Sequence, residues 1–193
     1  NGVDIQKYAT AQPSSELNNI APNCKKIIMV AGFRYQKDQD TLIRATALLP
    51  QEFHTFLVGD GERREVCEKL AIAEEVSDRV HFMGIRMDVP ELLKVADYVV
   101  MSSHWEGLSL ASIEGMSVGK PFLASDVDGL REITTNAGVL FQHQNATQLA
   151  EEIKVLDKNT AKYQQIAQQC FDKAKLFDIS IMEEKYNNVY LNV

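Results

Sequence analysis

Short apolar runs rich in β-branched and aromatic residues alternate along the chain with stretches whose apolar residues recur at helical spacing. From residue 26 onwards, strand-like runs occupy 27–31, 55–58, 80–83, 98–101, 121–124 and 138–141. Helical patterns follow four of these runs, at 41–49, 63–73, 90–96 and 109–117. Beyond the last run the pattern is helical over 146–156, 160–175 and about 179–191. A strand-then-helix repeat of this kind predicts a parallel β-sheet.

Because the predicted strands are almost continuously apolar, both faces of the sheet should be covered by helices. The expected fold class is therefore α/β, a Rossmann-like doubly wound parallel sheet with helices on both faces. We assign residues 25–177 to this domain. Residues 1–24 contain Pro13 and Pro22 and show little periodicity, so we interpret them as a hinge or linker, or as an edge segment of the domain. Residues 178–193 are assigned to a separate C-terminal helix.

The composition weighs against several classes of protein. A net charge of -7 at pH 7 without any Lys- or Arg-rich run weighs against nucleic acid as the main partner. Three cysteines without CxxC spacing and four histidines without ligand spacing predict neither a disulfide framework nor a metal site. No apolar run approaches the length of about 18 residues that a membrane span needs, so we expect no transmembrane segment and a cytoplasmic protein. The chain begins at Asn1 and not at methionine, which fits a fragment of a longer protein as well as a processed chain.

Ligands of open α/β sheets bind at the carboxyl ends of the strands, which directs attention to the loops that follow each strand. The first such loop holds Gly32, Arg34 and Lys37, and its two cations suit a phosphate group, although the loop taken alone is more typical of a solvated loop. The second is the turn Gly59-Asp60-Gly61, which would let the backbone approach a ligand closely. It lacks the spacing of dinucleotide and P-loop motifs, so a plain tight turn is an equal alternative.

The stretch 102–114 is the most informative loop. Glu106 precedes a predicted helix, and Glu114 follows eight positions later, about two turns along it. The N-terminus of that helix offers free N–H groups and the positive end of a dipole, which together suit a diphosphate. The two carboxylates could then accept hydrogen bonds from sugar hydroxyls on either side. Taken alone, a pair of glutamates at this spacing favours a simpler interpretation, with Glu106 as a partner of the helix dipole and Glu114 as a surface residue.

The segment EGLSLASIE at 106–114 resembles the E-x7-E motif of family 4 glycosyltransferases. Further segments resemble signatures of that family and occur in the same order along the chain. They are NGVD (1–4), VAGFRYQKD (30–38), VGDGE (58–62), RVHFMG (79–84), VADYVVMSSHWEG (95–107), GKPFLASDVDGLREI (119–133) and GVLF (138–141). Together they cover nearly the whole chain, so the resemblance does not depend on one short motif.

The resemblance implies that the chain is the C-terminal half of a two-domain GT-B fold, the half that binds a nucleotide diphosphate sugar. The acceptor-binding N-terminal domain would be missing, and residues 178–193 would cross back to it. The resemblance also implies an enzyme that transfers the sugar with retention at the anomeric carbon, usually without a metal. No cofactor is then expected beyond a UDP- or GDP-linked donor. The chain alone would be an incomplete enzyme, and any peripheral contact with a membrane would come through the missing half.

Carried over position by position, the resemblance implies roles for individual residues. Lys37 and the N–H groups of Leu108 to Leu110 would hold the diphosphate. Glu114 would bind the ribose hydroxyls, Glu106 a hydroxyl of the donor sugar, and the backbone at 85–86 the base. The full set of predicted ligand-contacting residues is Gly32, Arg34, Lys37, Gly59, Ile85, Arg86, Glu106, Gly107, Leu108, Ser109, Leu110 and Glu114, with Glu106, Lys37 and Arg34 as the catalytic candidates.

Three positions depart from the family pattern, among them Ser109, which stands where glycine is common. The family usually has arginine directly after the first strand, where this chain has Gly32. Arg34 lies two positions later and, on a strand-like alternation, on the same side. We therefore predict that Arg34 reaches back and substitutes for the usual arginine. Gly115 stands where alanine is common and should cost the helix roughly 1 kcal/mol.

Three other functions are compatible with parts of the pattern. A non-catalytic nucleotide-sugar-binding module would keep the phosphate and ribose contacts but could dispense with Glu106. A sugar-nucleotide epimerase shares the fold group but matches the paired glutamates less well. A pure interaction domain would leave the loop residues without a role. The sugar, the base and the acceptor are not determined by the sequence.

Overall fold

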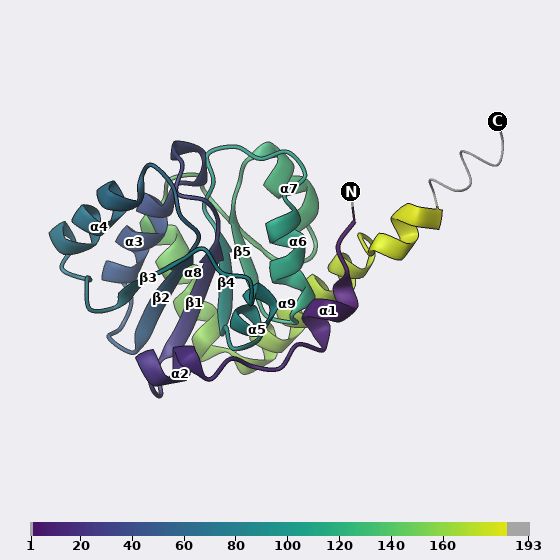
Figure 1. Ribbon diagram of the computed structural model, residues 1–193, viewed down its shortest axis with the longest axis horizontal. Helices are drawn as coiled ribbons and strands as arrows, with labels where there is room; N and C mark the ends of the chain where they lie inside the picture. Colours follow the sequence, from purple (N-terminus) through teal and green to yellow (C-terminus); the bar gives the residue numbers. More distant parts are fainter. Residues whose placement is uncertain (1, 185–193) are drawn as a thin grey trace.

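A single parallel sheet of six strands forms the centre of the computed structural model, which describes residues 2–184 (Figure 1). The strands lie in the order β3-β2-β1-β4-β5-β6, and every neighbouring pair is parallel. Their bounds are β1 (Lys25–Val30), β2 (Phe53–Val58), β3 (Val80–Gly84), β4 (Tyr98–Met101), β5 (Phe122–Ser125) and β6 (Val139–Phe141). Each strand coincides with a predicted apolar run, so the predicted doubly wound fold is confirmed.

Helices cover both faces of this sheet (Figure 1). The chain leaves β1 in one direction and β4 in the other, and because such crossovers are right-handed, the helices of the two halves lie on opposite faces. The first face carries α3 (Gln39–Ala47), α4 (Arg64–Ala73) and α8 (Ala146–Lys158), with α3 contacting both of the others. The second face carries α5 (Val89–Lys94), α6 (Leu110–Ser117) and α7 (Asp128–Thr134). Helix α9 (Thr160–Lys175) contacts both α8 and α6.

The segment expected to be a hinge, linker or edge contains two short helices, α1 (Ile5–Ala9) and α2 (Glu16–Ile20). Helix α1 contacts α5 and α6, and it buries Ile5 and Tyr8. The start of the chain also pairs with the end of α9, because the Val3 N–H donates to the Phe177 carbonyl at 3.0 Å. The chain is helical again over 179–184, and the rest of the predicted C-terminal helix lies outside the described residues. The division of the chain at residues 24 and 177 stays a prediction.

The centre of the sheet is fully buried and holds the core of the domain. Ile27, Ile28 and Met29 in β1 are at most 1% exposed, because helices lie above and below them. Gly115 shows how closely α6 packs on the sheet: a Cβ at this position would lie 2.7 Å from Cγ1 of Val99 in β4. The glycine that seemed unfavourable for the helix is therefore required by its contact with the strand.

Candidate functional site

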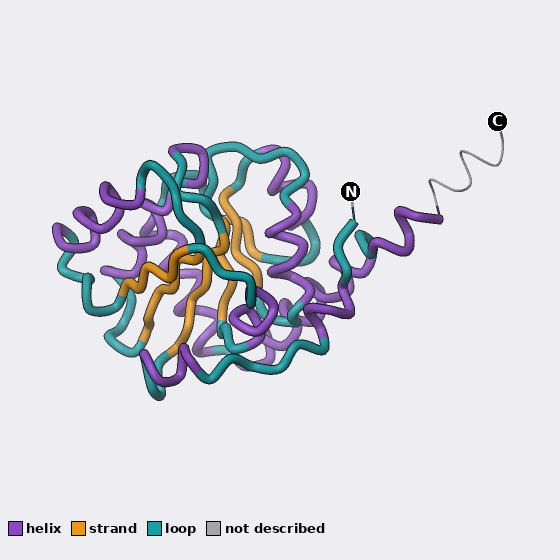
Figure 2. Tube along the Cα trace, viewed as in Figure 1, coloured by secondary structure: helices purple, strands orange, loops and turns teal. Residues whose placement is uncertain are grey.

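The loops after β1 and β4 meet at the carboxyl edge of the sheet (Figure 2). These two strands are neighbours, and the chain departs from them in opposite directions. Such a switch point is where open α/β sheets form a ligand crevice. The loop after β1 continues as the 3-10 helix η1 (Tyr35–Lys37), and the loop after β4 leads into α6. The two most prominent motifs of the sequence therefore lie side by side.

Hydrogen bonds join the two loops into one unit. The His104 N–H donates to the Gln36 carbonyl at 2.7 Å, and Nε2 of Gln36 donates to the Trp105 carbonyl at 2.8 Å. Deeper in the fold, the Ser102 hydroxyl donates to the Asp38 carbonyl at 2.7 Å. Each loop supplies hydrogen-bond partners for polar groups of the other loop. A substitution in one loop should therefore alter the conformation of both loops.

An ion pair between Lys37 and Glu106 lies at the centre of this unit, with Lys37 Nζ against Oε1 of the carboxylate. The Glu106 side chain is 6% exposed and that of Lys37 is 20% exposed. The carboxylate also accepts a hydrogen bond from the Ser103 hydroxyl at 2.7 Å. The fold therefore brings together two of the predicted catalytic candidates and holds the carboxylate in a fixed, largely desolvated position.

The N-terminus of α6 opens toward solvent next to this ion pair. Ser109 caps the helix by accepting a hydrogen bond from the Ser112 N–H at 3.4 Å. Among the described residues, the N–H groups of Leu108, Ser109 and Leu110 have no backbone acceptor outside the helix, and the Leu108 and Leu110 side chains are 44% and 38% exposed. Free N–H groups at the positive end of a helix dipole form an anion site.

Gly129, near the start of α7, fixes the position of the loop after β4. A Cβ at this glycine would collide with the carbonyl oxygens of Glu106 and Gly107. Gly129 was not among the residues predicted for the site, and α7 was not predicted. The sequence signal that could have identified Gly129 is its position in the first turn of a helix, where glycine is unfavourable.

Glu114 lies on the side of α6 that faces the N-terminal segment. Burial, followed by the charge and the hydrogen bonding of Glu114, raises the pKa of Tyr8 in α1 well above its usual value. The two glutamates of the E-x7-E motif therefore have different neighbours, because Glu106 contacts Lys37 whereas Glu114 lies against Tyr8. The sequence did not reveal the neighbour of Glu114, since α1 was not predicted.

The first loop also holds the other predicted phosphate ligands. The Gly32 carbonyl accepts hydrogen bonds from the Arg34 N–H at 2.9 Å and from Nε2 of Gln39 at 3.0 Å. Arg34 is exposed, and its guanidinium has no ion-pair or hydrogen-bond partner among residues 2–184. The side chain is thus available for an anion, and its predicted reach back toward position 32 stays a prediction.

The glycine turn after β2 packs against the first loop. Gly59 has a φ of 140°, and a Cβ there would collide with the Ala31 carbonyl. Gly61 has a φ of 155°, and a Cβ there would collide with the Phe33 backbone. The structure gives these glycines a role in the close approach of two protein loops. The predicted contact between Gly59 and a ligand stays a prediction.

The loop after β3 is anchored to the N-terminal segment. Arg86 forms ion pairs with Glu16 of α2 at 2.6 Å and with Asp88 at 2.7 Å, and the hydrogen bonds that it donates to both carboxylates raise its pKa. The neighbouring Ile85 is 78% exposed. The Arg86 side chain is therefore occupied, whereas the backbone at 85–86, which was predicted to meet the base, lies in an exposed loop.

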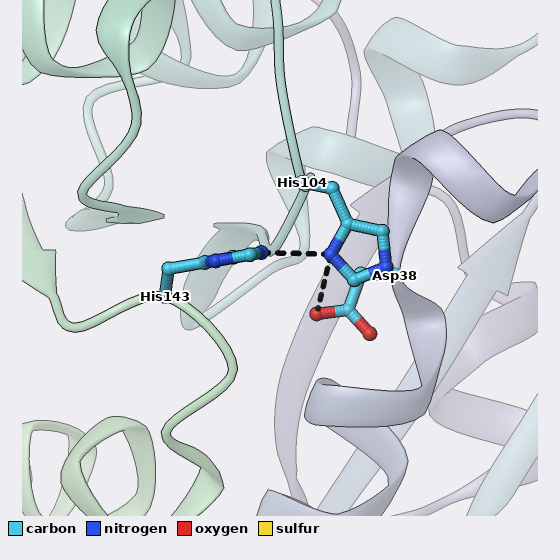
Figure 3. Close-up of side chains that lie close together, drawn as sticks. All are labelled: Asp38, His104 and His143. Carbon is cyan, nitrogen blue, oxygen red and sulfur yellow. Dashed lines mark hydrogen bonds and ion pairs between the residues drawn. The ribbon is translucent and has the colours of Figure 1, made fainter.

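A second polar cluster lies beside this unit and was not predicted. His104 Nδ1 lies 2.7 Å from Nε2 of His143 and 3.7 Å from Oδ2 of Asp38 (Figure 3). The three residues come from different loops, so no local spacing in the sequence signals them. A pocket of about 180 Å³ is lined by Asp38 and His104 together with Tyr35 and Arg63.

No helix in the described part of the chain is both long and apolar enough to cross a membrane.

Comparison with known sequences places most of the chain in one family. The family model described as "Glycosyl transferases group 1" matches residues 12–172. A Campylobacter jejuni protein, N,N'-diacetylbacillosaminyl-diphospho-undecaprenol alpha-1,3-N-acetylgalactosaminyltransferase, is 26% identical over 197 aligned residues, which cover 98% of this chain. The alignment covers 52% of that relative, so the chain spans about half of its length.

Solved structures show the same architecture. The Anabaena protein Alr3699/HepE in complex with UDP-glucose superposes with a TM-score of 0.90 at 27% identity, over 100% of this chain and 56% of that one. The C-terminal domain of a group 1 family glycosyl transferase, LpcC of Francisella tularensis, superposes with a TM-score of 0.76 at 21% identity. It covers 92% of this chain, and all of the Francisella chain is matched, so the two share a fold over the whole of that isolated domain.

Proposed function

The chain belongs to the group 1 glycosyltransferases, and we propose that it binds a nucleotide diphosphate sugar in the crevice between the loops after β1 and β4. In this proposal it is the donor-binding half of an enzyme that transfers the sugar with retention. The observation that carries the proposal is the buried contact of Lys37 with Glu106 directly beside the open N-terminus of α6. That arrangement combines a cation, free N–H donors and a fixed carboxylate within one site.

The diphosphate would lie across the N-terminus of α6. The N–H groups at 108–110 would donate to its oxygens, and the Lys37 ammonium and the exposed Arg34 guanidinium would supply positive charge. Negative charge grows on the nucleoside diphosphate as the glycosidic bond breaks, and donors that are already in place stabilise it without rearrangement. Each charge-assisted hydrogen bond would contribute roughly 1.5 to 3 kcal/mol.

Glu106 would orient the donor sugar. Its carboxylate is held by Ser103 and Gln36 as well as by Lys37, so it keeps its position when Lys37 turns toward a phosphate. A carboxylate is an acceptor with several lone pairs, which suits a sugar hydroxyl. We propose that donor binding divides the ion pair, with the phosphate taking the ammonium and the sugar hydroxyl donating to the carboxylate. The ammonium then keeps an anionic partner, and the carboxylate exchanges the ammonium for a neutral hydrogen-bond donor.

The nucleoside would extend from the diphosphate toward the N-terminal segment. Glu114 lies in that direction, against Tyr8, and would accept hydrogen bonds from the ribose hydroxyls. The exposed backbone at 85–86 would meet the base. Uridine is the base that the comparison favours, since the Anabaena neighbour was solved with UDP-glucose. Guanosine is the alternative base predicted from the sequence.

The acceptor would be bound by a second domain. The chain spans 52% of the Campylobacter relative and 56% of the Anabaena structure, which leaves room in those proteins for another domain of similar size. We propose that the enzyme requires such an N-terminal acceptor domain, and that any peripheral contact with a membrane is made there.

The thermal unfolding midpoint of the chain, titrated with UDP, GDP and ADP, tests this proposal. A ligand that binds only the folded state stabilises it by about 2.7 kcal/mol at 100 times its dissociation constant. We expect stabilisation by UDP or GDP that Glu114→Gln weakens. The matched control is Glu68→Gln, on α4, where Glu68 pairs only with Arg64 among residues 2–184. Equal stabilisation of both variants by the same nucleotide would contradict the role of Glu114.

A further inference from the structure

Three side chains with metal-binding atoms converge on one point at the carboxyl edge of the sheet (Figure 3). Asp38 lies at the start of α3, His104 in the loop after β4, and His143 in the loop after β6. One ligand atom from each lies within 4.8 Å of the others. The side chains of His104 and Asp38 are 8% and 5% exposed, so these two ligands lie inside the fold, whereas His143 is half-buried.

The polar groups of this cluster are only partly satisfied by one another. His104 Nδ1 faces both Nε2 of His143, at 2.7 Å, and Oδ2 of Asp38, at 3.7 Å. One ring nitrogen carries at most one hydrogen, so it cannot donate to both neighbours. Asp38 accepts hydrogen bonds from the Thr41 hydroxyl and N–H, but no lysine or arginine within residues 2–184 pairs with it. Burial raises the pKa of Asp38, as expected for a carboxylate whose charge lacks a full partner.

We propose that Asp38, His104 and His143 bind a divalent transition-metal ion of the zinc type. Zinc bonds of about 2.0 to 2.1 Å place tetrahedral ligand atoms about 3.3 Å apart. The two separations from His104 Nδ1, 2.7 Å and 3.7 Å, lie on either side of that value, and the remaining pair of ligand atoms lies within 4.8 Å, so side-chain rotations bring the three atoms into position. Both nitrogens offer a lone pair once the hydrogen between them has moved to the far nitrogen of its own ring. The ion then accepts a lone pair from each of the two imidazoles and from the carboxylate, so all three side chains have a partner.

The ligand set identifies the class of ion. Two imidazoles with one carboxylate are the three protein ligands of many zinc sites that keep a fourth position open. Imidazole ligands also favour transition metals over magnesium or calcium, which prefer oxygen. The pocket of about 180 Å³ lined by Asp38 and His104 lies beside the proposed ion and has room for a water molecule or a small anion in the fourth position. Arg63, which also lines it, is balanced by Asp40 at 2.9 Å.

This site differs from the proposed donor site and does not depend on it. Its residues are not among those predicted to touch the nucleotide sugar. The two are nevertheless mechanically joined, because the His104 N–H donates to the carbonyl of Gln36, which in turn contacts Glu106. An ion at this position would tie together the three loops that follow β1, β4 and β6.

The fold supplies an internal control in a second pair of histidines. His54 Nδ1 lies 2.9 Å from Nε2 of His81, on β2 and β3, in the same hydrogen-bonded arrangement as His104 and His143. In the described part of the chain, no carboxylate completes a metal cluster with that pair. A zinc ion that needs only two adjacent histidines would therefore bind at both places, whereas the proposed site needs Asp38 as well.

The test is a titration of the chelator-stripped chain with Zn²⁺ in competition with a chromophoric chelator, without nucleotide. We expect one equivalent to bind and the affinity to fall roughly 100-fold or more in His143→Gln and in Asp38→Asn, since even outer-shell changes cost 10- to 100-fold. Asparagine preserves the helix cap and the left-handed φ of 48° at position 38. His54→Gln and Cys24→Ser should bind as the wild type does.

Co²⁺ in place of Zn²⁺ gives a second readout that needs no substitution. Bound at this site, Co²⁺ should show visible ligand-field bands without a thiolate charge-transfer band. Burial raises the pKa of both Cys67 and Cys170 to about 12, so neither thiol should compete. The proposal is overturned if the wild-type chain binds no stoichiometric zinc, if either site variant binds as tightly as the wild type, or if the Co²⁺ spectrum shows a thiolate ligand.

Discussion

Replacement of Lys37 by methionine should destabilise the chain far more than the loss of a surface ion pair. The Glu106 side chain is 6% exposed and that of Lys37 is 20% exposed. Without the ammonium, Ser103 and Gln36 are the hydrogen-bond donors that the carboxylate keeps within the described part of the chain, and its position is largely desolvated. Breaking a buried pair costs roughly 3 to 5 kcal/mol, and the partial exposure of Lys37 reduces our expectation to about 2 to 3 kcal/mol. For a chain of this size that corresponds to roughly 4 to 12 °C in the unfolding midpoint.

A double variant separates the effect of charge from that of packing. Adding Glu106→Gln to Lys37→Met removes the uncompensated charge and should restore roughly 1 kcal/mol or more. The matched control is Lys69→Met, because Lys69 pairs with Glu65 on the surface of α4, where the two side chains are 72% and 77% exposed. That variant should lose no more than about 0.5 kcal/mol.

Urea unfolding followed by circular dichroism measures all four proteins. The reasoning is refuted if Lys37→Met and Lys69→Met lose the same stability, or if the double variant is less stable than Lys37→Met alone.

Four further predictions address single positions. Gly115→Ala should lose roughly 1 to 2 kcal/mol in thermal unfolding, because its Cβ would lie 2.7 Å from a Val99 methyl group; a gain in stability would contradict the packing of α6. Gly129→Ala should displace the loop after β4 and weaken UDP or GDP binding measured by calorimetry, and unchanged affinity would show that the loop does not depend on that contact. Arg34→Ala should weaken the same binding by about 1.5 to 3 kcal/mol while leaving stability within roughly 0.5 kcal/mol, whereas unchanged affinity would exclude it as the substitute arginine. Burial lowers the pKa of His81 to about 4, whereas the side chain in the unfolded chain has a pKa of about 6.5, so unfolding takes up a proton between these two pH values. The free energy of unfolding should therefore fall by roughly 1 to 2 kcal/mol from pH 7 to pH 5, and His81→Gln should reduce that pH dependence. An unchanged pH dependence in the variant would show that His81 is already protonated in the folded chain.

The sheet was predictable from the sequence because each strand carries its own signal. Runs such as 27–31 are apolar on both faces, which only a buried strand or helix explains, and turn residues limit their length. The elements that were missed are short or irregular. Helix α7 contains Gly129 in its first turn, and α1 buries Ile5 and Tyr8 only through contacts with distant helices. Local periodicity over five to seven residues does not distinguish such helices from loops.

The site was predictable only where the order of the strands in the sheet determines which residues lie together. Lys37 and Glu106 were both assigned to strand ends, and the neighbouring positions of β1 and β4 bring them together. Their direct ion pair could not be predicted, because side-chain contacts depend on how the two loops pack. The cluster around His104 was missed for the same reason: its members come from three loops, and histidines were judged by their spacing in sequence. Spacing reveals a metal site only when the ligands share one local segment.

The most direct test of the proposed donor site is a titration of ¹⁵N-labelled chain with UDP and GDP, followed through the backbone amide resonances. If the diphosphate binds at the N-terminus of α6, the amides of Leu108, Ser109 and Leu110 should shift most, and Lys37→Met should weaken the response. Thr160, at the opposite edge of the sheet, should not move. If neither nucleotide shifts these amides, or if the largest shifts lie elsewhere, the crevice between the loops after β1 and β4 is not the donor site.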